Sequence, residues 1–231
     1  SVCHRLDAVV TVTPHMVDYF KKLNSRTAFV SNYPLLEEMP AESSSVEKVK
    51  AIGFAGGVSE LWNHEKIITA LERIPDCRYC LCGNGEERYL DLLKALPGWG
   101  QVDFFGRIPH REVVQKLAQC TAGMAIATPG RNSGFLLGTM GNTKIFEEMM
   151  AGLPIICTNF VLWKEFVERY HCGICVDPAN VDEIADAIRY LLDHPDEARQ
   201  MGENGRRAVK EEFNWGVEEK KLLALYEDVL K

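Results

Sequence analysis

The stretch "GNTKIFEEMMAGLPII", residues 141–156, places a polar loop, a short helix and a buried strand in direct succession. Asn142 or Thr143 is expected to cap the helix, because side-chain oxygens of these types accept hydrogen bonds from the free amides at a helix start. Gly152 and Pro154 are expected to end it. The run "LPII" has the continuous apolar character of a strand covered on both faces. This succession is typical of an α/β protein with a parallel sheet.

The same alternation extends over most of the 231 residues. Six strand-like runs follow residue 48: "VKAIGFAG", "RYCLCG", "VDFFG", "GMAIAT", "LPIICT" and "GICVDP". Helical periodicity lies between or after them, at 60–73, 87–96, 111–119, 143–151 and 181–192. Right-handed crossovers would wind these elements into one sheet. The expected fold class is therefore α/β, a doubly wound, Rossmann-like parallel sheet with helices on both faces.

Composition divides the chain into four segments. Residues 1–34 contain a strand, a helix and a strand, and residues 35–48 have the proline, serine and glutamate content of a linker. Residues 49–214 form the main domain. The helical pattern near its C-terminal end is expected to be interrupted at Gly202 and Gly205. The last helix, 215–231, carries an apolar face that must be buried against another element: Leu222, Leu223, Leu225, Tyr226, Val229 and Leu230.

Charge and cysteine usage exclude several classes of protein. The formal net charge of −7 argues against nucleic acid as a partner, since phosphate backbones require clustered Lys and Arg. The pairs Cys77/Cys80 and Cys172/Cys175 have the spacing of zinc ligands, yet most of the eight cysteines fall inside strand-like runs. We therefore expect no metal and reduced cysteines. Without a visible signal peptide or membrane span, a cytoplasmic location is expected.

Glycine-rich loops follow the first two strands of the main domain. Ligands bind beyond the carboxyl ends of the strands in open α/β sheets, and glycine lets a backbone approach a phosphate. Gly56 and Gly57 follow the first strand, and Gly83 and Gly85 follow the second. Neither loop has the G-x-G-x-x-G spacing of dinucleotide-binding folds. Each loop alone is compatible with a phosphate cradle or with a plain tight turn.

The helix that begins near Thr143 belongs to the same edge of the sheet. Its free amides and Lys144 would suit a diphosphate, and Glu147 could accept hydrogen bonds from two ribose hydroxyls. The alternative is a surface ion pair between Lys144 and Glu147, which contributes about 0.2–0.5 kcal/mol. His64, His110 and His171 are interpreted as surface or capping residues.

Several segments, in order, resemble the C-terminal half of the family 4 glycosyltransferases, which have the GT-B fold. They are "GFAGGVSELWNHEKIITALERI", "CLCGNGEE", "VDFFGRIPHREVVQKLAQCTAGMAIA", "NTKIFEEMMAGLPIICT", "CGICVDPANVDEIADAIRYLL" and "ENGRRAVKEEFNW". In the segment around "TKIFEEMMAGLPII" the family holds the ribose of a nucleotide with a glutamate, so the match assigns that role to Glu147. Residues 1–34 resemble the end of the N-terminal, acceptor-binding domain, of which they would be a remnant, with the helix at 215–231 packing back on it.

The resemblance implies a retaining, metal-independent transfer of a sugar from a nucleoside diphosphate sugar, with UDP, GDP or ADP as the nucleotide and no cofactor. This chain would be mainly the donor-binding half and inactive alone. The acceptor, a glycan or a lipid-linked sugar as in polysaccharide biosynthesis, would bind the missing domain, and the full-length protein would be open to peripheral membrane contact. Lys144 and Glu147 would be catalytic, within a donor site made of Gly56, Gly57, Gly83, Gly85, Arg107, Ile108, Arg131, Asn142, Thr143, Lys144, Ile145 and Glu147.

The chain also departs from the family. Gly57 and Trp62 stand where the family often has an Arg and a Lys that neutralise the diphosphate, and Thr139 stands where many members have a second glutamate. Lys144 would replace part of the missing charge, as in a subgroup with the pattern N/P-x-K-x-x-E. Two alternatives remain. One is a non-catalytic nucleotide-binding or regulatory module, favoured by the uncharged Gly57 and Trp62, and the other is a nucleotide-sugar epimerase or a phosphorylase-like enzyme of the same fold.

Overall fold

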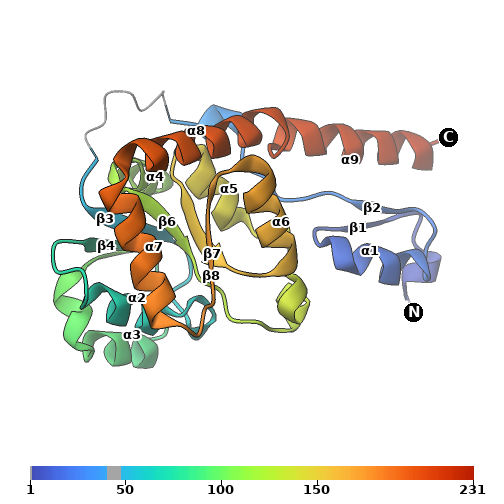
Figure 1. Cartoon of the computed structure of the whole chain (residues 1–231). Helices are drawn as coiled ribbons and strands as arrows, with labels where there is room; N and C mark the ends of the chain where they lie inside the picture. The colour runs from blue at the N-terminus through green and yellow to red at the C-terminus, as the bar shows by residue number, and fades with distance from the viewer. Residues whose placement is uncertain (1, 41–47) are drawn as a thin grey trace.

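The computed structural model describes residues 2–40 and 48–231. Its larger sheet has six parallel strands in the order β5-β4-β3-β6-β7-β8 (Figure 1). Because β3 is the first of these six strands in the chain and pairs with both β4 and β6, the sheet is wound outward in two directions from its middle. The predicted doubly wound α/β fold is confirmed. The strands are β3 (Ala51–Ala55), β4 (Arg78–Cys82), β5 (Val102–Gly106), β6 (Ala122–Ala125), β7 (Ile155–Thr158) and β8 (Gly173–Val176).

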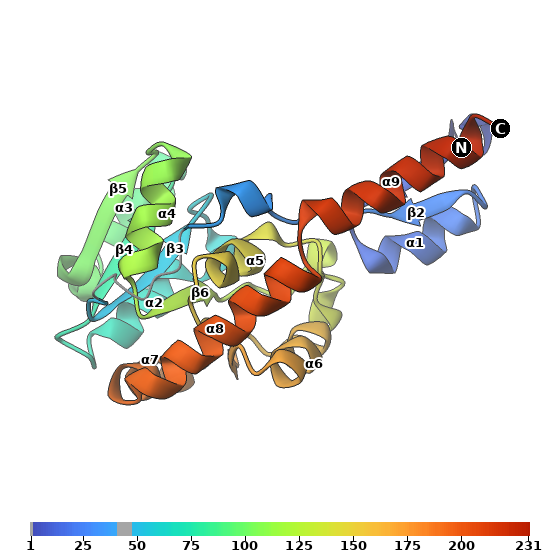
Figure 2. The ribbon, with the colours of Figure 1, turned by 90° about the horizontal axis from the view of Figure 1, so that it is seen from above.

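Helices cover both faces of this sheet (Figure 2). One face carries α2 (His64–Leu71), α3 (Glu87–Lys94) and α7 (Val181–Asp193). The other carries α4 (His110–Gln119), α5 (Thr143–Met150) and α6 (Val161–Tyr170), and α8 (Pro195–Glu211) packs on α5. Short 3₁₀ helices connect these elements: η1 (Val2–Arg5), η2 (Leu36–Glu38), η3 (Glu60–Trp62), η4 (Pro97–Gln101), η5 (Arg131–Ser133) and η6 (Phe135–Leu137).

The strands are apolar at consecutive positions because both of their faces are covered. Ile155, Ile156 and Cys157 of β7 are all fully buried. Cys80 and Cys82 of β4 are buried too, and the cysteines from 77 to 175 form no disulfide within the described residues. Cysteine therefore serves as a small apolar residue in the core of this sheet.

The predicted interruptions of helix α8 are wrong. The helix is continuous from residue 195 to 211, and both Gly202 and Gly205 are buried inside it. A Cβ at Gly202 would collide with the carbonyl oxygen of Gly152 at the end of α5. The glycines thus permit close packing between two helices, which outweighs their unfavourable helix propensity. The helix that follows begins where expected, because the side chain of Asn214 accepts a hydrogen bond from the amide of Val217.

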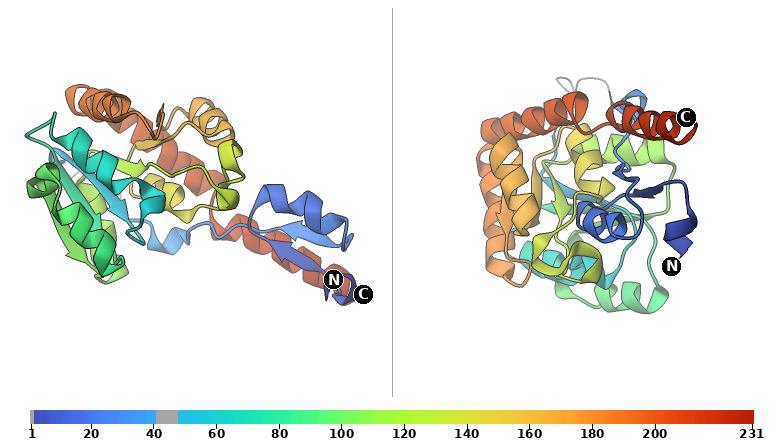
Figure 3. Two further views of the ribbon diagram at one scale, coloured as in Figure 1. Left: turned by 90° about the horizontal axis from the view of Figure 1, so that it is seen from below. Right: turned by 90° about the vertical axis from the view of Figure 1, so that its right-hand side faces the viewer.

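The N-terminal segment forms a separate small sheet. It consists of β1 (Val9–Thr11) paired in parallel with β2 (Thr27–Phe29), with α1 (Pro14–Lys21) between them. The last helix, α9 (Trp215–Val229), leaves the main domain and lies beside this sheet (Figures 1 and 3). The carboxylate of Glu218 is fully buried and accepts a hydrogen bond from the amide of Ser31 at 2.8 Å.

The apolar face of α9 is only partly covered. Leu222, Leu225 and Val229 are half-buried, whereas Leu223, Tyr226 and Leu230 are exposed. The small sheet of β1 and β2 with α1 does not cover the whole apolar face of α9. Three of the six residues expected to be buried are half-buried, and the other three are exposed. The predicted linker, 35–48, contains η2, and its residues 41–47 lie outside the described residues.

Candidate functional site

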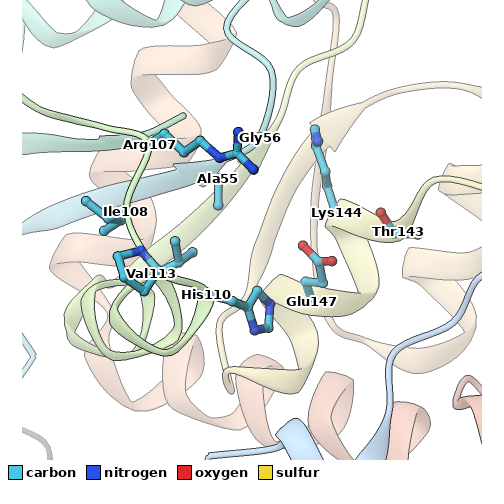
Figure 4. A pocket seen from close by; sticks show the side chains of 10 residues that line it. Ala55, Gly56, Arg107, Ile108, His110, Val113, Thr143, Lys144 and Glu147 are labelled. Atoms are coloured by element: carbon cyan, nitrogen blue, oxygen red, sulfur yellow. The ribbon is translucent and has the colours of Figure 1, made fainter. Parts of the chain in front are cut away.

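A cleft of about 670 Å³ opens at the carboxyl edge of the larger sheet (Figure 4). The end of β3, the loop between β5 and α4, and the first turns of α4 and α5 form its walls. This is the edge at which the strand order reverses between β3 and β6, the usual ligand position in an open α/β sheet. The lining residues are Ala55, Gly56, Arg107, Ile108, Pro109, His110, Val113, Thr143, Lys144 and Glu147.

Half of the predicted donor-site residues line this cleft: Gly56, Arg107, Ile108, Thr143, Lys144 and Glu147. They come from three segments that are distant in the chain. The other six predicted residues do not line the cleft: Gly57, Gly83, Gly85, Arg131, Asn142 and Ile145.

The start of α5 is held by Asn142. Its side-chain oxygen accepts a hydrogen bond from the amide of Lys144 at 3.1 Å, so Asn142 rather than Thr143 is the N-cap. Ile145 is 3% exposed, and its side chain is part of the core. Only the backbone of Ile145 is therefore available to a ligand, at the positive end of the helix.

Lys144 and Glu147 are not paired with each other. Glu147 is half-buried and its carboxylate points into the cleft, whereas the Lys144 side chain extends toward Gly56 (Figure 4). Among the described residues, neither side chain makes an ion pair within 4.0 Å. The alternative of an i,i+3 surface ion pair therefore does not describe this structure, and both charges remain available to a ligand.

The glycines of the two loops have different roles. Gly56 and Gly83 have φ of 147° and 140°, in a region that favours glycine, and a Cβ at Gly83 would collide with the carbonyl oxygen of Gly56. Gly85 approaches the backbone of Val58 in the same way. Gly83 and Gly85 thus hold the loop after β4 against the loop after β3. A Cβ at Gly57 would meet nothing within 4 Å.

Arg131 lies in η5, within the long connection between β6 and α5, and its side chain is exposed. It does not line the cleft. The predicted contact of Arg131 with a donor therefore has no geometric support in this arrangement of the loop.

Comparison with known proteins identifies the family. The profile of the "Glycosyl transferases group 1" matches residues 37–208, well over half of the chain. The chain belongs to the group 1 glycosyl transferases. The resemblance to this kind of enzyme, based on the motifs around Glu147, is thereby confirmed.

Two curated relatives agree with this assignment. The chain is 33% identical over 118 residues to the MMP alpha-(1->4)-mannosyltransferase of Mycolicibacterium hassiacum. The matched region covers 50% of this chain and 27% of the relative. It is 28% identical over 160 residues, 66% of this chain and 40% of the relative, to the GDP-mannose-dependent monoacylated alpha-(1-6)-phosphatidylinositol monomannoside mannosyltransferase of Corynebacterium glutamicum. The chain thus spans well under half the length of these two curated relatives.

Two solved structures share the fold. HepE of Anabaena in complex with UDP and glucose has a TM-score of 0.77 at 16% identity, covering 98% of this chain and 65% of that protein. The sucrose-phosphate synthase of Thermosynechococcus elongatus has a TM-score of 0.77 at 19% identity, covering 99% of this chain and 60% of that protein.

Some residues of the glycosyl transferase cleft were not among the predicted site residues. Pro109, His110 and Val113 line the wall formed by the start of α4. His110 is exposed, and Figure 4 shows its ring on the side of the cleft nearest Glu147. The sequence did contain a feature that could have indicated these three cleft residues. They follow closely after Arg107 and Ile108, the pair predicted to contact the base.

The interpretation of His64 as a surface or capping residue is wrong. Its side chain is fully buried, and its Nδ1 shares a hydrogen bond of 2.9 Å with the hydroxyl of Tyr79. The ring also lies edge-on to Phe54, with centroids 4.6 Å apart. Burial, with a smaller effect from the charge of Lys144, lowers the pKa of His64 to about 3. His64 is therefore a neutral part of the core beneath the cleft.

Glu148 is a second buried polar residue near Lys144. It is 1% exposed, and neither of its carboxyl oxygens has a partner with normal hydrogen-bond geometry. Burial raises the pKa of this carboxyl well above its usual value, although Lys144 opposes the shift. Burial therefore disfavours the negatively charged form of Glu148.

Within residues 2–40 and 48–231 of the glycosyl transferase chain, His, Cys, Asp and Glu side chains do not gather in groups of three that could hold a metal ion. Every helix in the same ranges is too short or too polar to cross a bilayer.

Proposed function

We propose that this chain is the donor-binding half of a retaining, metal-independent glycosyltransferase, and that its cleft holds a nucleoside diphosphate hexose. One observation carries the proposal. Lys144 and Glu147, one turn apart at the start of α5, both reach the same cleft and are not paired with each other. A cation and a carboxylate at this separation suit a ligand that presents a diphosphate to one and ribose hydroxyls to the other.

The remaining walls suit the same ligand. The amide end of α5 and the backbone at Gly56 border the cleft, where they would stabilise the departing diphosphate. Arg107 and Ile108, on the opposite wall, would contact the base. The positive charge then comes from the protein, and the proposed reaction uses neither a metal ion nor a cofactor.

The names of the relatives support a hexose donor. One relative is named for dependence on GDP-mannose, and HepE was solved with UDP and glucose. We propose UDP- or GDP-hexose as the donor, with a glycan or lipid-linked sugar bound by the rest of the longer protein as the acceptor. The C. glutamicum relative is named for a phosphatidylinositol monomannoside, which supports peripheral membrane contact of the full-length protein. A cytoplasmic location is part of the proposal.

Calorimetric titration with UDP, GDP and ADP tests the donor site. We expect micromolar-range binding of at least one nucleotide, and a loss of about 100-fold in affinity for Glu147→Gln, because a carboxylate accepting two ribose hydroxyls makes two charge-assisted hydrogen bonds. Glu203→Gln, at an exposed position on α8, is the matched control and should bind like wild type. Failure of all three nucleotides to bind, or unchanged affinity in Glu147→Gln, would refute the proposal.

A non-catalytic nucleotide-binding module is the second candidate, because Gly57 and Trp62 carry no charge. A turnover assay on the full-length protein separates the two. Release of UDP or GDP from the corresponding hexose donor, with a sugar product that keeps the anomeric configuration, supports the transferase. Nucleotide binding without turnover supports the module, and conversion of one nucleotide sugar into another would indicate an epimerase.

A further inference from the structure

The ammonium group of Lys144 lies against two aromatic rings. Its Nζ is 5.2 Å from the ring centroid of Trp62 and 5.5 Å from that of Phe54. Its tip also lies beside Gly56, where a Cβ would overlap it. No carboxylate of residues 2–40 or 48–231 lies within ion-pair distance of this group. The group is therefore held by rings at the wall of the cleft rather than by an opposite charge.

The position of Trp62 is fixed by the turn that follows it. Trp62 is 7% exposed at the end of η3, and its ring packs on Phe54 with centroids 5.5 Å apart. The next residue, Asn63, has the left-handed conformation, with φ of 48° and ψ of 38°. Its side-chain amide donates hydrogen bonds to the carbonyl of Ile126 at 3.1 Å and to the hydroxyl of Thr128 at 2.9 Å. These bonds tie the loop after β3 to the end of β6, so the indole has little freedom to move.

The neighbouring titratable groups form no ion pair with Lys144. His64, edge-on to Phe54, is neutral in the core, and Glu148, one turn after Lys144 on α5, is fully buried, where burial disfavours its charged form. Glu147 points into the cleft instead of toward the ammonium. The cation thus faces the open cleft with only weak partners, which an anion can supplement without first breaking an ion pair.

We propose that Trp62 and Phe54 are positioning residues that hold the Lys144 ammonium at the place where the donor's diphosphate binds. The inference rests on the proposed function, and it assigns a role to a tryptophan that does not line the cleft. The cationic group comes from α5, whereas the aromatic wall comes from β3, which contains Phe54, and from the loop after it, which contains Trp62. A preorganised ammonium does not have to be ordered when the diphosphate binds, so removing the wall weakens binding even though the charge is kept.

The experiment measures affinity for a nucleoside diphosphate and for its nucleoside. UDP and uridine, or GDP and guanosine if GDP binds more tightly, are titrated by NMR against wild type, Trp62→Leu, Lys144→Met and the double variant. We expect Trp62→Leu to weaken diphosphate binding about tenfold, because a cation–π contact and the ordering of the lysine are lost. Lys144→Met should weaken it about 30-fold or more. The double variant should match Lys144→Met, and nucleoside affinity should change less than about twofold throughout.

Two further variants exclude a general loss of structure. Trp62→Phe keeps an aromatic ring and should retain diphosphate affinity within about threefold of wild type. Trp62→Lys combined with Lys144→Met moves the cation to the loop after β3, and it should recover at least part of the affinity lost in Lys144→Met. Thermal unfolding of each variant identifies those that remain folded at the titration temperature, and these are the ones compared.

The outcomes separate the inference from the proposed function. If wild type binds none of UDP, GDP and ADP, the donor site itself is refuted. If wild type binds, the inference alone fails in either of two cases: the effects of Trp62→Leu and Lys144→Met multiply in the double variant, or Trp62→Leu weakens the nucleoside as much as the diphosphate. Equal affinities of wild type and folded Trp62→Leu for the diphosphate would likewise overturn it.

Discussion

The buried histidine beneath the cleft makes the stability of this protein depend on pH. The pKa of His64 is about 3 in the folded chain, against an ordinary value of 6.5 when it is unfolded. Below pH 6.5 the unfolded chain therefore binds a proton that the folded chain excludes, and acid favours unfolding. The stability supplied by the neutral imidazole is fully present above pH 6.5 and is progressively lost as the pH falls toward 3.

The size of the effect follows from the pKa difference. Protonation of the unfolded state changes its free energy by about 0.1 kcal/mol at pH 7.5, about 1.4 kcal/mol at pH 5.5 and about 2.7 kcal/mol at pH 4.5. His64→Gln removes this term and keeps a polar partner for the hydroxyl of Tyr79. Urea unfolding of wild type and variant at pH 7.5 and 5.5 gives the difference, and wild type should lose about 1.3 kcal/mol more than His64→Gln over this interval.

Tyr79→Phe is the matched control for this prediction. It removes the hydrogen bond to His64 but keeps the buried imidazole, so the variant should be less stable at every pH and still show the extra loss below pH 6.5. If wild type and His64→Gln lose the same stability between pH 7.5 and 5.5, the histidine is not buried in its neutral form and the reasoning is refuted.

Three further predictions concern other buried or capping positions. Burial raises the pKa of Glu148 in the folded chain, whereas the unfolded chain ionises above about pH 4.5. Wild type should therefore lose stability relative to Glu148→Gln as the pH rises above 4.5, and a pH-independent difference in urea unfolding would contradict this. Gly202→Ala should destabilise by about 1–3 kcal/mol through overlap with α5, whereas Gly100→Ala, where a Cβ meets nothing within 4 Å, should change stability by less than about 0.5 kcal/mol in the same assay. Asn142→Ala and Asn180→Ala each remove a helix cap, and each should lower the free energy of unfolding by about 1 kcal/mol. Only Asn142→Ala should also weaken UDP or GDP binding in calorimetry; if both variants bind the nucleotide equally well, the cap at Asn142 does not contribute to the site.

The fold could be predicted because its signals are local. The length and apolar character of each strand, and the periodicity of the helices between them, depend on neighbouring residues alone. The interruptions predicted in α8 were wrong for the opposite reason. Gly202 normally weakens a helix, and only the approach of the α5 end explains why it lies within one.

The candidate site could be predicted in part. Gly56, Arg107, Ile108, Thr143, Lys144 and Glu147 were chosen from loops that parallel strands bring to one edge, and they line one cleft. His64 was misjudged because a histidine beside a helix start is usually exposed, and its burial depends on the packing of Phe54 and Tyr79 around it. Gly83 and Gly85 were expected at a ligand, but they serve the contact between two loops.

The sequence by itself determined the alternating elements, the edge of the sheet at which ligands bind, and the helix start that carries Lys144 and Glu147. These features follow from short-range periodicity and from the geometry common to all parallel sheets. Only the tertiary structure decided which side chains meet there. Lys144 lies beside Trp62 because β3 and β6 are neighbours in the sheet, although the two residues are far apart in the chain. That neighbourhood depends on the order of the strands, which no local pattern specifies.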